Sequence, residues 1–98
     1  MMTFEKVLEV FKDYLDEDDM YEVVSTSRGY TLLEWDRQCG EWTGVKLCPT
    51  PEALVDALMY GYTGLLEYQA TLGRRELNDG DRAQVEAARQ AMLEKLNG

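Results

Sequence analysis

The side chains of this sequence that could carry out chemistry are carboxylates, tyrosines and two cysteines, because the chain contains no histidine. Histidine is the usual general base, it activates most Ser and Cys nucleophiles, and it is the commonest transition-metal ligand. Carboxylate pairs such as Asp13/Glu17 and Glu22/Glu34 could serve as acid and base in principle. Nothing in their spacing requires that they converge on one substrate. We therefore predict no enzymatic activity, no catalytic residue and no cofactor.

Neither the cysteines nor the acidic run predicts a metal site. Cys39 and Cys48 form no CxxC motif. The hairpin described below places them too far apart for a disulfide, so we expect two free thiols, as is usual in an intracellular chain. The run over residues 16–19 is too contiguous for a calcium loop, which needs ligands at alternate positions and a central glycine. We expect no bound metal.

Negative charge is the strongest signal in the composition. The net charge is −9, and residues 1–67 hold fourteen acidic and five basic residues, whereas residues 68–98 hold five of each. Such a surface repels nucleic acids and anionic membranes and attracts basic proteins. The acidic run is either a solvated loop or part of a surface that presents carboxylates as a nucleic acid presents phosphates. On the second interpretation the partner-binding carboxylates are Asp13, Asp16, Glu17, Asp18, Asp19, Glu22, Glu34, Asp36 and Glu41.

Three helices and three strands must position these residues. An apolar stripe predicts a helix over residues 4–15, which the acidic run should end because negative charge is unfavourable at a helix C-terminus. Residues 21–26, 30–36 and 41–48 alternate or are β-branched and are separated by turn residues, which predicts an antiparallel meander.

Two more helices complete the chain. Thr50 and the proline after it predict a helix that runs to about residue 71, with Leu72 in its buried stripe and Gly73 as its C-terminal cap. Asn78 and Asp81 have the spacing of a capping box and predict a last helix. The expected fold is a single α+β domain over residues 1–98 in the order α-β-β-β-α-α.

The predicted hairpins divide the strand residues between two sheet faces. Pairing Asp36 with Glu41 places Trp35 opposite Trp42, and a three-residue first turn places Tyr21 opposite Trp35. The face suited to packing under the helices then holds Val24, Tyr30, Leu32, Val45 and Leu47. The other face holds Tyr21, Val23, Leu33, Trp35 and Trp42. Either the last helix covers this second face, or it is an apolar patch typical of protein interfaces, with Tyr21, Leu33, Trp35 and Trp42 as partner-binding residues.

The glycines of the second predicted helix allow a further interpretation. Gly61 and Gly64 lie three residues apart, which would let another backbone approach that helix closely. The alternative is close packing of the helix against the sheet.

The element order resembles the double-stranded RNA-binding domain, whose signature is a basic cluster at the start of its last helix. Here the corresponding stretch is Thr50-Pro51-Glu52-Ala53, followed by Asp56, so RNA binding does not carry over. Element order and negative charge together are more similar to the small acidic inhibitors of CRISPR nucleases carried by phages and mobile elements. That resemblance spans the whole chain, and it implies an inhibitor that occupies a nucleic-acid groove.

We therefore expect a non-catalytic, cytoplasmic protein-binding module. Its most specific form is an acidic inhibitor that blocks the basic DNA or RNA groove of a nuclease or another nucleic-acid enzyme, without itself binding nucleic acid or membranes. An alternative is a structural or regulatory domain that forms a homodimer through the aromatic sheet face or the glycine-containing helix face. A third is a small carboxylate-based enzyme.

Overall fold

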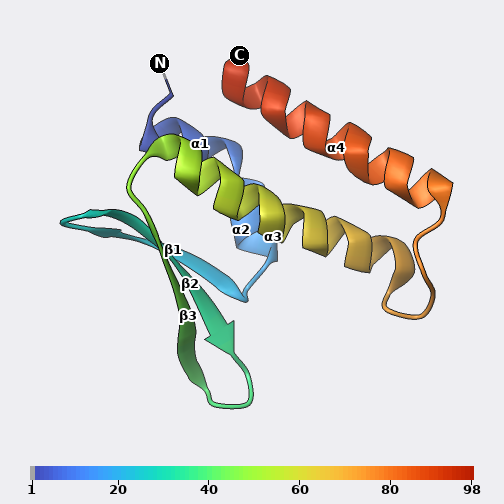
Figure 1. Ribbon diagram of the computed structural model, residues 1–98, viewed down its shortest axis with the longest axis horizontal. Coiled ribbons are helices and arrows are strands. Elements are labelled where there is room, and N and C mark those ends of the chain that lie inside the picture. The colour runs from blue at the N-terminus through green and yellow to red at the C-terminus, as the bar shows by residue number, and fades with distance from the viewer. Residues whose placement is uncertain (1) are drawn as a thin grey trace.

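The computed structural model describes residues 2–98 and confirms the predicted α+β class and element order (Figure 1). Three strands form one antiparallel meander with the order β1-β2-β3. All four helices lie on the same side of this sheet. The elements are α1 (Phe4–Val10), α2 (Lys12–Glu17), β1 (Tyr21–Thr26), β2 (Gly29–Asp36), β3 (Glu41–Cys48), α3 (Pro51–Thr71) and α4 (Asp79–Asn97).

The predicted first helix is instead two short helices joined at Phe11, and it ends later than expected. Phe11 keeps the backbone ladder continuous, since its N–H donates to Val7 and its carbonyl accepts from Leu15. α2 continues through Glu17. The helix therefore ends within the acidic run, as predicted, but two residues later than residue 15. Asp18 is its C-terminal cap, and the Asp18 N–H donates to the carbonyl of Tyr14 at 2.9 Å.

The predicted starts of α3 and α4 are confirmed in atomic detail. The Thr50 hydroxyl accepts from the N–H of Ala53 at 3.1 Å. Asn78 and Asp81 form the reciprocal capping box, with distances of 2.8 and 3.0 Å.

The end of α3 differs from the prediction. Leu72, not Gly73, is the C-terminal cap; it adopts the left-handed conformation with φ 54° and is 55% exposed. Its expected place in the buried stripe was therefore wrong. Among the described helices, none combines the length and apolar character that crossing a bilayer requires.

The core lies where α1, α2, α3 and α4 meet above the sheet. Its fully buried side chains are Val7, Phe11, Cys48, Leu54 and Leu58. α4 packs against α1 and α3 rather than against the strands. Both cysteines are free as expected, with Cys39 exposed and Cys48 buried, and burial raises the pKa of the Cys48 thiol.

The register of the sheet differs from the prediction at both hairpins. The first turn has two residues rather than three, so Tyr21 lies opposite Glu34 rather than Trp35. In the second hairpin Trp35 lies opposite Trp42 as predicted, but a β-bulge leaves Thr43 unpaired and brings Glu34 opposite Gly44. Each difference is a shift of one residue, which moves side chains to the opposite face.

The two sheet faces are therefore constituted differently from the prediction. Tyr21 and Val23 lie on the helix-covered face together with Tyr30, Leu32 and Cys48. The face away from the helices, here called the open face, carries Val24, Leu33, Trp35, Trp42, Val45 and Leu47. Tyr21 is thus not on the open face, whereas Val24, Val45 and Leu47 are.

Candidate protein-binding surfaces

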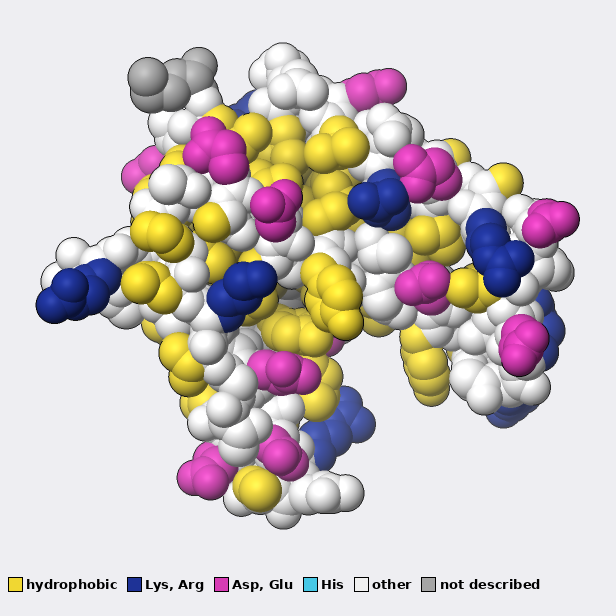
Figure 2. Space-filling model, in the orientation of Figure 1, with side chains coloured by type: hydrophobic (Ala, Val, Ile, Leu, Met, Phe, Trp, Pro, Cys, Tyr) yellow, Lys and Arg dark blue, Asp and Glu magenta, His cyan; other side chains and the backbone are white. Residues whose placement is uncertain are grey.

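A groove of about 640 Å³ lies between α3, the segment that leads into β1 and the second half of β2. Figure 2 shows the molecule hollowed between the β2–β3 hairpin and the far end of α3. Four carboxylates line the groove, together with one guanidinium, that of Arg89 on α4, which pairs with Glu86 at 2.8 Å. The carboxylates belong to Asp18, Glu34, Asp56 and Glu67. We call this the acidic groove.

One wall of the acidic groove is a stripe along α3. Asp56, Tyr60, Gly64 and Glu67 recur at the spacing of a single helix face. Tyr60 is 82% exposed, so its ring is available to a partner. Asp56, Tyr60 and Glu67 were not among the predicted site residues, although their spacing of four and seven residues could have identified them.

Two tyrosines pack at the base of the groove: Tyr21, which lines it and is partly buried, and Tyr14, which is buried behind Asp18. The Tyr14 hydroxyl donates to Asp18 at 2.9 Å, and the other Asp18 oxygen accepts from the N–H of Met20 at 3.2 Å. Burial, assisted by Asp18, raises the pKa of Tyr14 far above its ordinary value. Burial, assisted by Glu34, likewise raises the pKa of Tyr21. Both phenols are therefore neutral at physiological pH.

The two glycines of α3 have different surroundings. A methyl group at Gly61 would overlap the Tyr14 hydroxyl and touch the Tyr21 ring, so Gly61 lets these rings pack against the helix. This confirms close packing at Gly61, although the nearest partner is Tyr14 of α2. Gly64 faces the groove, with open space where a side chain would stand.

The remaining carboxylates of the acidic run are exposed and partly paired. Asp16 pairs with Lys12 at 2.6 Å, and Asp19 pairs with Arg37 of the hairpin tip at 3.5 Å. The Glu17 carboxylate accepts from Gln69 at 2.7 Å. Such exposed pairs contribute little to stability, and they leave the carboxylate oxygens accessible to competing cations.

The structure does not bring the nine predicted carboxylates onto one surface. Asp13 is exposed on α2, Glu34 faces the groove, and Glu22 lies on the side of the open face. Asp36 holds the hairpin turn: N–H donors from Cys39 and Gln38 lower the pKa of its carboxyl. Glu41 lies opposite Asp36 in the register. Asp18 and Glu34 are the two members that meet in the acidic groove.

The open face is the second candidate surface. The rings of Trp35 and Trp42 pack edge to face with centroids 5.1 Å apart. Val45 is 70% exposed, Leu47 46% and Trp42 40%. Among residues 2–98, no helix packs on this side of the sheet, because α4 lies on α1 and α3. The alternative that the last helix covers this face is therefore wrong.

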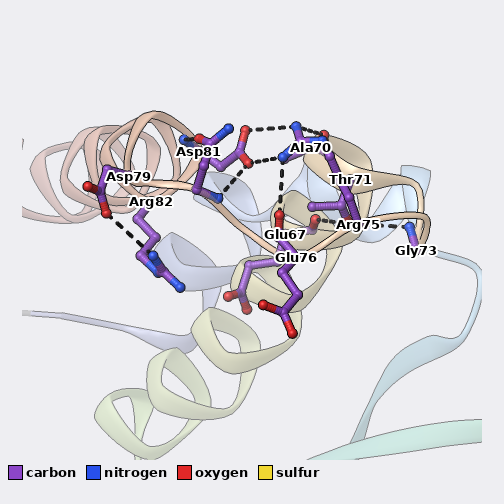
Figure 3. Close-up of polar contacts among 10 residues, drawn as sticks. Glu67, Ala70, Thr71, Gly73, Arg75, Glu76, Asp79, Asp81 and Arg82 are labelled. Atoms are coloured by element: carbon purple, nitrogen blue, oxygen red, sulfur yellow. Dashed lines mark hydrogen bonds and ion pairs between the residues drawn. The ribbon is translucent and has the colours of Figure 1, made fainter.

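An ion pair joins the end of α3 to the start of α4, and its arginine is therefore not free to form an anion site (Figure 3). Arg75 donates to both oxygens of Asp81, at 2.6 and 3.2 Å, and to the carbonyl of Ala70 at 3.0 Å. This guanidinium, with the N–H of Asn78, lowers the pKa of Asp81. The pair therefore fixes the end of α3 to the start of α4.

Within residues 2–98, no group of His, Cys, Asp and Glu side chains could hold a metal ion. No protein-family model, curated protein or solved structure matches the chain. The function therefore has to be argued from the two surfaces themselves.

Proposed function

We propose that the protein is a non-catalytic, cytoplasmic module that binds a basic surface of another protein through its acidic groove. The observation that carries this proposal is the convergence of four carboxylates and the exposed Tyr60 ring on one groove that contains a single guanidinium. The same groove could not hold a nucleic acid or an anionic membrane without strong repulsion.

The groove suits arginine-rich or lysine-rich segments for two reasons. Carboxylates accept charge-assisted hydrogen bonds from guanidinium groups, which are often bidentate. An exposed tyrosine ring adds a cation–π contact of about 0.5–1 kcal/mol. Each exposed contact is weak alone, so affinity requires several carboxylates to act together across the groove.

In its most specific form, the proposal is that the partner is a nuclease or another nucleic-acid enzyme, and that the module competes with DNA or RNA for its basic groove. Supporting this form are the net charge of −9 and the additional exposed carboxylates of Asp13, Asp16, Glu17 and Asp19 on α2 and in the loop after it. Such an inhibitor needs no catalytic group. Its action is to occupy positions that phosphates would otherwise take.

The test uses a labelled oligo-arginine peptide as a defined basic probe, and capture of host proteins at low and high salt. The groove variant Glu34→Gln/Asp56→Asn/Glu67→Gln removes three charges without changing side-chain shape. It leaves Asp18 intact because that carboxylate also holds Tyr14. We expect peptide affinity to fall at least about tenfold, and salt dependence to flatten, because fewer charges are screened.

The matched control is Glu5→Gln/Glu9→Gln/Glu94→Gln, which removes the same number of charges at exposed positions on α1 and α4. We expect it to change peptide affinity by less than about threefold, since none of its three carboxylates lines the groove. Equal losses in both triple variants would mean that net charge alone attracts the peptide, and the groove proposal would fail. A captured host protein that added DNA or RNA does not displace would contradict the mimic form.

A further inference from the structure

The open face is an apolar surface that the fold leaves without a partner. Six apolar side chains lie on it, and three of them are between 40% and 70% exposed. The largest apolar patch on a soluble monomer is often a functional surface. The proposed basic partner does not account for it, since the acidic groove is on the other side of the sheet.

The charge distribution indicates what covers this face. The molecule carries a net charge of −9, yet Glu22 at the edge strand is the one charged side chain among the outward-facing residues of the three paired strands. A basic partner would therefore gain little Coulomb energy there. A surface that is apolar and nearly uncharged is complementary to another of the same kind, and every copy of the chain supplies one.

We infer that the open face seats a second copy of this chain, so that two three-stranded sheets pack face to face with the helices outside. Trp35, Trp42, Val45 and Leu47 form the centre of the seam. Sheets packed in this way lie about 10 Å apart and interdigitate their side chains. A two-fold axis makes the contact isologous, which closes the assembly at two copies.

The size of the face sets the expected strength of the dimer. Three strands of six to eight residues give a face of roughly 14 by 26 Å, or roughly 360 Å² in projection. A standard interface buries about 800 Å² per partner. The dimer is therefore weak, with a dissociation constant on the order of micromolar to tens of micromolar.

The seam contains both tryptophans of the chain, which provides an internal reporter. We expect sedimentation velocity of the full chain from about 1 to 500 µM to show a monomer–dimer equilibrium. Tryptophan emission should shift to the blue over the same concentration range as the rings leave water. A monomer throughout, with unchanged emission, would overturn the inference and leave the groove proposal untouched.

The decisive variant is Val45→Lys, because a highly exposed side chain can be changed without disturbing the fold. It makes the molecule less negative, which by net charge alone would favour association. Buried in the seam, however, two unpaired lysines should raise the dissociation constant about 100-fold or more. Leu47→Lys should act in the same direction.

The matched control is Tyr68→Lys, which makes the same charge change at a 59% exposed apolar position on α3. We expect it to leave both the dimer and the emission shift unchanged. Loss of the dimer in Tyr68→Lys but not in Val45→Lys would place the seam on α3 and overturn the inference. Far-UV circular dichroism on each variant verifies that the fold is retained.

Discussion

The two faces of one sheet differ sharply in burial although they are built from alternate residues of the same strands. On the helix-covered face, Leu32 is 9% exposed and packs under α3. On the open face, Val45 of the neighbouring strand is 70% exposed. The apolar character is similar on the two sides, so hydrophobicity alone does not decide which side is buried. Turn length and one unpaired residue decide which side chains lie on the buried side, because they set the register.

The largest expected effect tests this contrast in stability. Leu32→Ala removes buried methyl groups and leaves a cavity, so the free energy of unfolding should fall by about 3 kcal/mol. Val45→Ala should lower it by about 0.5 kcal/mol or less, because the side chain is exposed in the monomer. Urea unfolding at low micromolar protein concentration measures both. Equal losses would mean that Val45 is already buried in the monomer.

A second pair of variants contrasts the packed and open sides of α3. Gly61→Ala should lower the free energy of unfolding by about 1 kcal/mol net, because its methyl group would overlap the hydroxyl of the buried Tyr14. Gly64→Ala should raise it by about 1 kcal/mol, because alanine favours the helix and the position is open. Thermal and urea unfolding measure whether each variant raises or lowers the free energy of unfolding. A stabilising Gly61→Ala would contradict the close packing described here.

The smallest effect contrasts a covered carboxylate with an open one. Asp81 is 9% exposed and bound by Arg75, whereas Asp79 is fully exposed. The folded-state pKa of Asp81 lies below its ordinary value of 3.8. The stabilisation that the Arg75–Asp81 pair gives the fold is therefore complete above pH 3.8, and it is lost as the pH falls through the folded-state pKa.

Asp81→Asn should therefore lower the midpoint of thermal unfolding at pH 7, and its difference from the unchanged protein should shrink toward pH 3. The matched variant Asp79→Asn should change the midpoint little at either pH. A difference for Asp81→Asn that persists undiminished in acid would mean that the ion pair does not provide the stabilisation.

Local patterns predicted most of the elements. Thr50, Asn78 and Asp81 define helix starts through side-chain capping that depends on a few neighbouring residues, and all three act as expected. The strands were predicted to within one residue, because turn residues separate them clearly.

The sequence could not predict the sheet register or the position of α4. The bulge at Thr43 and the two-residue first turn each shift the pairing by one residue, and no residue type in either turn requires that choice. α4 has an apolar stripe that fits several surfaces, so its packing on α1 and α3 depends on the assembled core. The acidic groove was missed for the same reason, since Asp56 and Glu67 meet Glu34 only after α3 folds back over the sheet.

The bulge at Thr43 has a consequence for how this protein behaves at high concentration. β3 is an edge strand, and an uninterrupted edge is a template onto which further strands can add without limit, as in fibrils. The unpaired residue breaks the regular hydrogen-bonding ladder of β3, and Lys46 adds a charge to the same strand. Strand addition at the β3 edge is thereby discouraged, while the apolar face remains accessible. If the open face binds a second copy as we infer, the contact closes at two molecules, and the interrupted β3 edge does not extend it into a continuous sheet.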